Sequence, residues 1–469
     1  MSKNKTGKLW NFLDHLAGDK VVWLILLLLM MFSILFIFSS SSRLISSTTS
    51  RLDIMKDHLK IVALGLAFVI ILYQIKNIEF FRKVSFLGLP LSFLLLLILY
   101  IFHGTKLCPE INGAVRFIEI HGLQIHVLEI VKVAMIMYIA AVIDAFENNK
   151  IAPLFEKISQ KEHFEWLSKL WAQKIIIIYI PFILVILLCI KASITASIFI
   201  SAILAVTIAV GTKDVKVLLV MAAIMGVIVG GLYASYTHSI NNGEKPHKLA
   251  SRIGTGVNRV ISPNYYKIYK ESTDKRKKNE ALDKLRQPYS ARLAIKQGVI
   301  PKGPGQSTQR YVVPDMSEDY MFSFIIEEYG ILGGLLIMIL YVSLAARGVL
   351  IIKNCGNNIF AKCAVFGLVL LISGQAFIHI LVNMDFGLLT GQTLPLLSHG
   401  SFAFLCFSIA FGIILSISRI SNKRIERQAK MLAMENADPV KSSLDSLDQM
   451  ESALEKNEYE DIPQTEGDY

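Results

Sequence analysis

Long apolar runs separated by shorter polar stretches dominate the chain. Each run is close to the ~20 residues that an α-helix needs to cross a bilayer core of ~30 Å. Ten runs are expected to span a membrane, at residues 20–40, 58–75, 84–102, 125–146, 174–191, 193–211, 215–236, 320–346, 360–383 and 395–418. The pattern therefore predicts an all-α polytopic membrane protein with about ten transmembrane helices.

The polar stretches divide the chain into segments. Residues 1–19 form a short cytoplasmic N-terminal segment, and residues 20–236 hold the first seven predicted helices. Residues 237–319 form one large loop, and residues 320–418 hold the last three helices. The tail at 419–469 turns acidic from about residue 435, and this last part is expected to be disordered.

Lysine and arginine residues in the short loops predict the orientation in the membrane. They gather in alternate loops, at 76–83, 213–216 and 347–353, and again after the last run, at 419–427. With an even number of spans, this pattern places both termini in the cytoplasm and the large loop outside. The inner loop at 147–173 mixes both charge signs with aromatic residues, so an amphipathic interfacial helix is expected there.

Composition supports the membrane assignment. The chain has 469 residues, of which 53% are hydrophobic, and this excludes an ordinary soluble globular protein. The net charge of +11 suits an anionic membrane surface or an anionic substrate. Nucleic acid is not expected as a partner, because the basic residues lie between apolar runs. The cysteines lack metal-ligand spacing, so neither a disulfide nor a zinc site is expected.

The junction between the large loop and the run at 320–346 carries the strongest candidate chemistry. A Gly/Pro-rich stretch begins at Gly298 and ends in a cluster of acids that includes Glu318 and Asp319. Acids at the end of a membrane helix are candidates for a functional site, and a flexible loop suits a bulky polar substrate. The structural alternative is that Ser317 is the N-cap and the two acids occupy the first helical turn.

This junction resembles the SEDS family of polytopic membrane glycosyltransferases, which includes FtsW, RodA and SpoVE. The usual family sequence is a glycine-rich loop, then L-P-E-x-x-T-D-F, then a helix that opens with E-E-L-G. This chain reads V-P-D-M-S-E-D-Y from Val313 to Tyr320, and E-E-Y-G from Glu327 to Gly330. The resemblance implies that Asp319 is the catalytic aspartate. Glu318 replaces the family threonine and adds a negative charge beside it.

Two motifs in the first half supply candidate anion-binding residues. The sequence N-G-A-V-R-F-I, which contains Arg116, resembles the family's N-G-A-x-R-W-I. Glu129 and Lys132 keep the family's E-x-x-K and lie on one face of a predicted helix. A planar guanidinium suits a pyrophosphate, so Arg116 and Lys132 are the leading candidates for binding one. The alternatives are lipid headgroups for Arg116 and a structural ion pair for Glu129 and Lys132.

The large loop contributes further basic candidates for substrate binding. Arg259, Arg292 and Lys302 add positive charge to the loop that ends at Asp319. Exposed basic residues are usually only solvated, so these three rank below Arg116.

The last polar segment resembles the family's N-x-G-x-x-P-x-T-G-x-x-L-P-F-x-S-Y-G-G-S. Asn383 and Ser398 keep its outline, and His399 replaces the tyrosine. We expect His399 to be a hydrogen-bonding histidine rather than a catalytic one. The glycines and prolines of this segment predict a re-entrant or broken helix that lines a cavity.

The resemblance implies a peptidoglycan glycosyltransferase that polymerises lipid II at the outer face of the bacterial cytoplasmic membrane. An FtsW-like role in division is favoured over a RodA-like role in elongation. Asp319 would take the proton of the attacking hydroxyl, and positive charge would steady the departing undecaprenyl pyrophosphate. A divalent cation, Mg or Mn, could share that work, and no other cofactor is implied.

The resemblance also implies partners, namely a class B penicillin-binding protein and the division or elongation machinery. Two other functional classes stay open. A flippase for lipid-linked precursors would use the same basic cavity without chemistry, and a scaffold for a penicillin-binding protein would need only the outer surfaces.

Overall fold

The computed structural model describes residues 17–41, 50–110, 115–120, 122–159, 165–244, 246–247, 250–251, 254, 269–272, 274–313, 316–384, 386 and 391–437. Arg259, part of the large loop and the acidic tail from residue 438 onward lie outside this range. The expectations about them therefore stay expectations.

Helices make up most of the described chain. The first half contains α2 (Lys20–Ser40), α3 (Arg51–Gln74), α4 (Ile78–Ser85), α5 (Gly88–Ile101), α6 (Val127–Glu147), α7 (Ala152–Ser159), α8 (Leu170–Lys174), α9 (Ile180–Ala192), α10 (Ile194–Thr212) and α11 (Lys216–Asn241). The second half contains α14 (Lys275–Gln297), α15 (Met321–Asn354), α16 (Ile359–Asn383) and α17 (Ser401–Ala437). Strands β1 (Phe117–Ile120) and β2 (Leu123–His126) form an antiparallel hairpin.

Each of the ten predicted spans corresponds to a helical segment. Within the described part of the chain, eight segments are long and apolar enough to cross a membrane. The remaining two, α3 and α6, are 24 and 21 residues long and carry more charge. The prediction of an all-α polytopic membrane protein is confirmed.

Several predicted boundaries were wrong. The span expected from residue 125 begins at Val127, because the two residues before it belong to β2. Gly122 has φ +81°, a turn conformation that favours glycine, and it lets the chain reverse into the hairpin. The span expected from residue 395 begins at Ser401, because the described residues before it, 391–400, form irregular turns.

The loop at 147–173, where an amphipathic interfacial helix is expected, contains several short helical segments. The described part of this loop holds α7, a short 3₁₀ turn at Glu165–Ser168 and the start of α8. Trp166 and Trp171 are exposed and their rings stack with centroids 6.3 Å apart.

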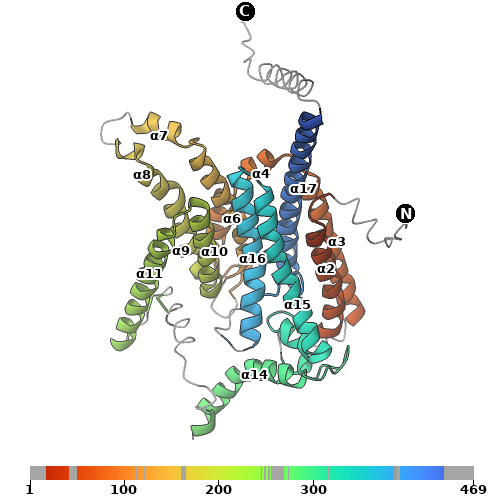
Figure 1. Ribbon diagram of the computed structural model, residues 1–469. Helices are drawn as coiled ribbons and strands as arrows, with labels where there is room; N and C mark the ends of the chain where they lie inside the picture. The colour runs from red at the N-terminus through yellow and green to blue at the C-terminus, as the bar shows by residue number, and fades with distance from the viewer. Residues whose placement is uncertain are drawn as a thin grey trace, which may run out of the picture.

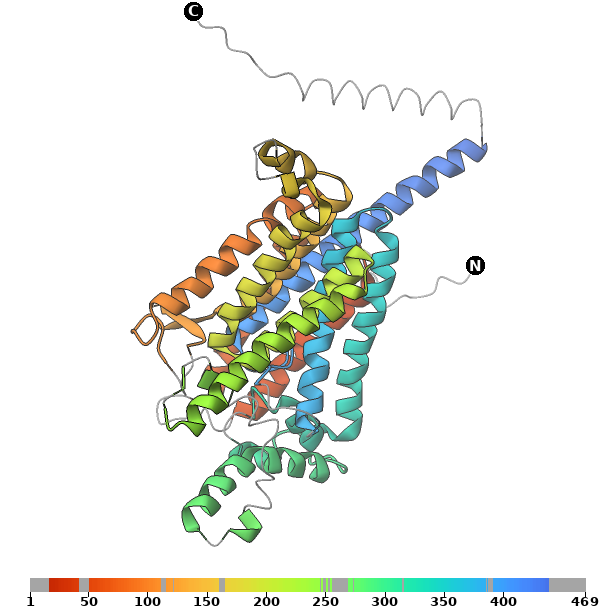
Figure 2. The ribbon, with the colours of Figure 1, turned by 90° about the vertical axis from the view of Figure 1, so that its left-hand side faces the viewer.

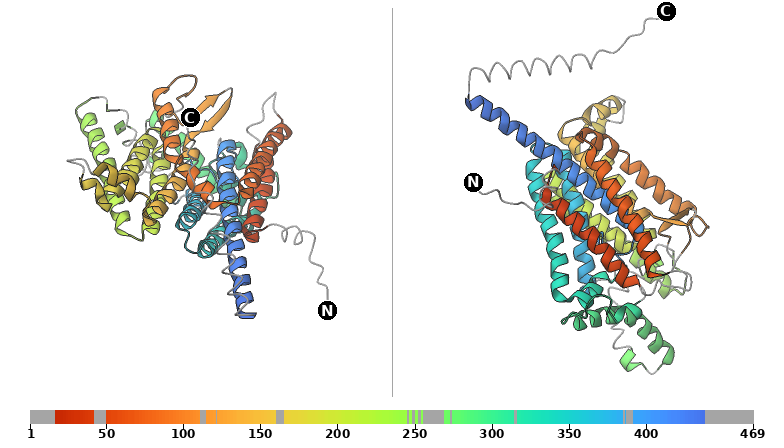
Figure 3. Two further views of the ribbon diagram at one scale, coloured as in Figure 1. Left: turned by 90° about the horizontal axis from the view of Figure 1, so that it is seen from above. Right: turned by 90° about the vertical axis from the view of Figure 1, so that its right-hand side faces the viewer.

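The bundle is built around α6, α16 and α17. Seen along its axis, α17 lies between the α2–α3 pair and the helices α6 and α16, all of which it contacts (Figure 3). Gly65 allows α3 to approach α17 closely, because a Cβ there would lie 2.6 Å from the Ser408 hydroxyl. In contrast, α11 diverges from the bundle (Figure 1), and only 6% of its most apolar stretch is buried.

The two ends of the bundle differ. One end carries α7 and the C-terminal part of α17, whereas α14 lies across the opposite end (Figure 1). The β1–β2 hairpin also lies toward the α14 end (Figure 2).

Helix α15 contains a break, and at this break it contacts the segment that follows α14. Gly330 has φ +77° inside the helix, and a Cβ there would press on Pro301 at 3.3 Å while holding a disfavoured backbone conformation. The carbonyls of Glu327 and Glu328 accept hydrogen bonds from the backbone N–H groups of Lys302 and Gly303, at 3.2 and 3.0 Å. The positive φ explains the glycine of the E-E-Y-G motif.

Candidate functional site

Asp319 lies in a turn at residues 316–320, immediately before α15. The helix begins at Met321, its N-cap is Tyr320, and its first turn contains no acid. The structural alternative, with Ser317 as N-cap and two first-turn acids, is therefore wrong. Two N–H groups at the start of α15 are satisfied from α16 instead. Phe322 N–H donates to His379 Nε2 at 3.4 Å, and Ser323 N–H donates to Asn383 Oδ1 at 2.9 Å.

Asn383 fixes the backbone on both sides of this turn. Its side-chain NH₂ donates to the carbonyl of Asp319 at 3.1 Å, while its oxygen also accepts from the Ser323 hydroxyl at 2.8 Å. The Asn383 side chain is buried. Through these hydrogen bonds it holds the backbone on both sides of Asp319.

The segment at 391–400 wraps around the same turn. The Ser398 hydroxyl donates to the carbonyl of Glu318 at 2.7 Å and accepts from the N–H of Leu394 at 2.8 Å. The N–H of His399 donates to the carbonyl of Ser317 at 2.8 Å. A Cβ on Gly391 would lie 3.6 Å from the nearer carboxylate oxygen of Asp319, so this glycine backbone lies beside the carboxylate.

The side chain of Lys132 donates a hydrogen bond to Gln392 in the 391–400 segment. Its ammonium lies 2.7 Å from Glu129 Oε1, 2.8 Å from Gln375 Oε1 and 3.2 Å from Gln392 Oε1. An ammonium has three N–H donors, and three acceptors surround this buried one. The geometry favours a structural ion pair that also positions the residue next to Gly391.

Charged groups from several elements lie around His126, near Asp319. This residue ends β2, one position before α6, and part of its surface is exposed. Desolvation by the surrounding groups is the main cause that lowers the pKa of His126. The carboxylates of Glu129 and Glu318 oppose this shift, and the cations Arg116 and Lys132 add to it. The fold therefore brings candidates from α6, the hairpin and the Asp319 turn into one region.

Arg116 is exposed at the edge of this region. Unlike the ammonium of Lys132, its guanidinium is not enclosed by acceptors from α6 and α16. A guanidinium in this position can meet an anion that enters from solvent.

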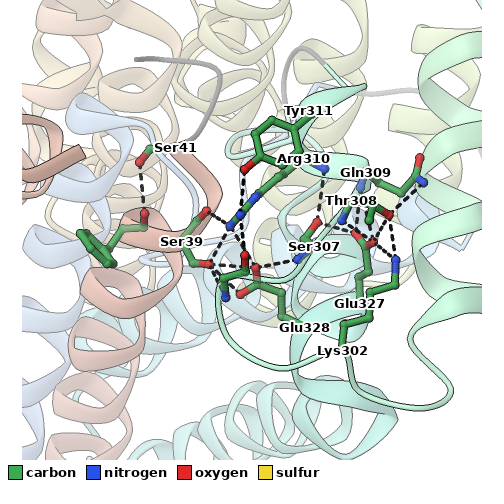
Figure 4. A network of polar contacts seen from close by, with 12 residues as sticks. Ser39, Ser41, Lys302, Ser307, Thr308, Gln309, Arg310, Tyr311, Glu327 and Glu328 are labelled. Atoms are coloured by element: carbon green, nitrogen blue, oxygen red, sulfur yellow. Dashed lines mark hydrogen bonds and ion pairs between the residues drawn. The ribbon is translucent and has the colours of Figure 1, made fainter. Parts of the chain in front are cut away.

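Lys302 lies in a separate network that anchors the loop to α15 (Figure 4). Its ammonium lies 2.6 Å from Glu327 Oε1 and also donates to Gln297 and Thr308. Arg310 pairs with Glu328 at 3.4 Å, and the Ser39 hydroxyl of α2 donates to both oxygens of Glu328. Both acids are fully buried. The network ties α2, the loop and α15 together, so Lys302 is engaged in structure.

The remaining sequence candidates are Arg292 and His399. Arg292 is exposed on α14, and His399 is half-buried at the start of α17. His399 Nδ1 lies 3.7 Å from Glu318 Oε1. Among the described residues, no group of three or more histidine, cysteine or acidic side chains could hold a metal ion.

The sequence analysis assigned no role to Gln375, His379 or Gln392. Gln375, His379 and Asn383 are spaced four residues apart and are buried along α16. Polar residues repeating every four positions in an apolar run lie on one helical face, and this signal could have revealed them.

The sequence model of the family described as "Cell cycle protein" (FtsW, RodA and SpoVE) matches residues 19–423. The chain belongs to this family. The bundle is thus that of a multi-pass membrane protein.

Curated relatives of the family match over stretches of different length. A probable peptidoglycan glycosyltransferase FtsW of Caulobacter vibrioides is 31% identical over 122 residues, which cover 26% of this chain and 31% of the relative. Stage V sporulation protein E of Bacillus subtilis is 33% identical, and the match covers 26% of this chain and 34% of the relative. The chain thus spans about a third of the length of these two relatives. A probable FtsW of Enterococcus hirae is 26% identical, with 68% of this chain and 72% of the relative covered.

Two solved structures share the fold. One, of a peptidoglycan synthase complex, matches with a TM-score of 0.56 and 17% identity, and covers 87% of this chain and 99% of the other. A mutant of the Thermus thermophilus rod shape determining protein RodA matches with a TM-score of 0.50 and 15% identity, and covers 86% and 98%.

Proposed function

We propose that this protein is a peptidoglycan glycosyltransferase that polymerises lipid II, with Asp319 as the general base. The observation that carries this proposal is the placement of the Asp319 carboxylate. Its backbone is held by Asn383 and its side chain lies beside Gly391, in a turn that does not need the carboxylate as a helix cap. Family membership and the names of the relatives support the reaction.

The chemistry assigns a task to each group. The 4-hydroxyl of one disaccharide attacks the anomeric carbon of the growing chain, and Asp319 takes the hydroxyl proton. The bond to undecaprenyl pyrophosphate breaks, and the diphosphate leaves with its negative charge. Arg116 is the candidate that meets this charge, because it is exposed in the region where charged groups converge.

We further infer that the Asp319 end of the bundle faces outward and that both termini are cytoplasmic. Support comes from the basic short loops and from the position of α14, opposite the end that carries α7. The structural likeness to a member of a peptidoglycan synthase complex supports a class B penicillin-binding protein as partner. The FtsW names among the relatives favour cell division as the context.

The test is reconstitution of the purified protein with labelled lipid II and its cognate penicillin-binding protein. Polymerised glycan strands are expected, and Arg116→Ala should reduce turnover far more than Lys275→Ala, because Lys275 lies on α14, outside the converging charges. Transport of lipid II across vesicles without polymer would favour a flippase. Stimulation of the partner alone, without polymer or transport, would favour a scaffold.

A further inference from the structure

Glu318 and His399 are two departures from the family pattern, and they face each other beside Asp319. Glu318 replaces a threonine and His399 replaces a tyrosine, on segments separated by about eighty positions in the chain. Their side chains approach to 3.7 Å, between Glu318 Oε1 and His399 Nδ1. The side chain of Glu318 is 50% exposed and that of His399 is 27% exposed, so the pair lies at the solvent side of the site.

The backbone around the pair is held independently of these two side chains. The His399 N–H donates to the Ser317 carbonyl, and the Ser398 hydroxyl donates to the Glu318 carbonyl. Removing the carboxylate or the imidazole would therefore leave the two segments together. The contact between the side chains acts mainly on the local charge rather than on the fold.

The local charge matters because the proposed substrate carries a diphosphate. Glu318 adds a second carboxylate next to Asp319 in a region that must admit this anion, and like charges repel across a partly desolvated site. A protonated His399 would cancel the charge of Glu318. A neutral His399 would leave it uncompensated.

We propose that Glu318 and His399 form a charge-compensating pair that tunes how tightly the site binds the lipid diphosphate. The proposal rests on the proposed function, since it concerns the substrate of that reaction. With His399 protonated the pair is neutral as a whole, and with His399 neutral the pair carries one negative charge. The KM for lipid II should therefore rise with pH. This dependence should require the His399 imidazole, whereas the Glu318 carboxylate sets the overall level of KM.

Other titratable groups surround the pair, and the experiment must separate their effects. The ring centroid of His58 on α3 lies 6.4 Å from that of His399. The Nε2 atom of His58 is 2.6 Å from the hydroxyl oxygen of Ser33. The other groups nearby are Asp319 in the turn, His126 at the end of β2, and Glu129 and Lys132 on α6. None of these residues is replaced in the variants below, so they are common to every profile, except that His58 no longer experiences the charge of His399 where His399 is replaced.

The experiment measures kcat and KM for lipid II between pH 5.5 and 8.5 in the full-length protein with its partner. The variants are His399→Tyr, Glu318→Thr and the double variant, which introduce the residues of the family pattern. In the wild type, KM is expected to rise about two- to fivefold across this range, the size typical of exposed ion pairs. In His399→Tyr, KM should already be high at pH 5.5. In Glu318→Thr, which lacks the carboxylate that repels the diphosphate, KM should be lower than in the wild type throughout this range. In the double variant, this pair should contribute no pH dependence to KM.

A matched control exists elsewhere in the chain. His103 Nδ1 and Glu110 Oε2 form a similar pair at 3.6 Å in the loop after α5, and both side chains are exposed. The double replacement His103→Tyr with Glu110→Thr should leave the KM profile as in the wild type. His399→Gln provides a second neutral variant if the tyrosine disturbs folding.

The outcomes separate the two proposals. An identical pH dependence of KM in the wild type and the double variant would overturn the pair as a charge device, while polymerisation itself would stand. A wild-type protein that forms no polymer under any condition would overturn the proposed function, and this inference with it.

Discussion

Replacement of Lys132 by methionine is expected to destabilise the protein and to impair the site without touching Asp319. The ammonium of Lys132 is only 1% exposed and lies within 3.2 Å of acceptors on Glu129, Gln375 and Gln392. Methionine keeps most of the side-chain volume but offers no donor. Glu129 would then keep a charge without its partner, and Gln392 would lose its tie to α6.

The size of the effect follows from this burial. Removing one partner of a buried ion pair typically costs about 3–5 kcal/mol. Glu129 is 17% exposed, so water can reach the remaining carboxylate and a value near the lower end, about 3 kcal/mol, is expected. Adding Glu129→Gln removes the unpaired charge, so the double variant should recover a large part of the lost stability.

Denaturant titration of the purified protein in detergent measures the free energy of unfolding. Polymerisation of lipid II measures the effect on the site, and we expect a loss of at least tenfold because Gln392 adjoins Gly391, which lies beside Asp319. Lys353→Met, at the exposed end of α15, is the matched control and should change neither quantity. Wild-type stability and activity in Lys132→Met would refute the positioning role of this lysine.

Three further predictions concern the loop, the helix break and the orientation. Gly330→Ala should lower the free energy of unfolding by about 1–3 kcal/mol, because Gly330 has a positive φ. The control Gly226→Ala on α11, which has open space around it, should be neutral or slightly stabilising. Equal shifts of the thermal unfolding midpoint in the two variants would contradict the role of Gly330. Glu328→Gln should cost about 3 kcal/mol by leaving Arg310 buried without its counter-ion, and adding Arg310→Met should reduce that loss in denaturant titrations. Lys275→Cys should react with an impermeant thiol reagent on intact cells, and labelling that appears only after lysis would reverse the proposed orientation.

The helices were predictable from sequence because apolar runs of membrane length leave few alternatives to a spanning helix. Their ends were less predictable. The hairpin before α6 depends on Gly122 and on four-residue strands, which are too short to stand out beside apolar runs. The start of α17 was placed too early because Leu396 and Leu397 are apolar yet lie in a turn.

The residues of the site could be predicted from the sequence, but their structural roles were less predictable. Asp319 and Asn383 were identified from motifs, but the capping of α15 by α16 is a contact between helices that local sequence cannot reveal. The hydropathy of the chain marks Lys132 as costly to bury, and only the structure shows that three acceptors surround it. For Lys302, only the charge was evident from the sequence, because its partner Glu327 lies beyond a turn and a helix start.

Polymerisation of lipid II by Asp319→Asn is the most direct test of the proposed reaction. Asparagine keeps the shape of the side chain, and the hydrogen bonds that Asn383 and Ser398 make to this turn involve backbone carbonyls, so the turn should survive. An amide cannot take a proton at neutral pH, so a loss of about 10²–10⁴-fold is expected. Glu318→Gln, one residue away, removes the same charge and should have the milder effect. Near-normal polymerisation by folded Asp319→Asn protein would contradict the assignment of Asp319 as the general base.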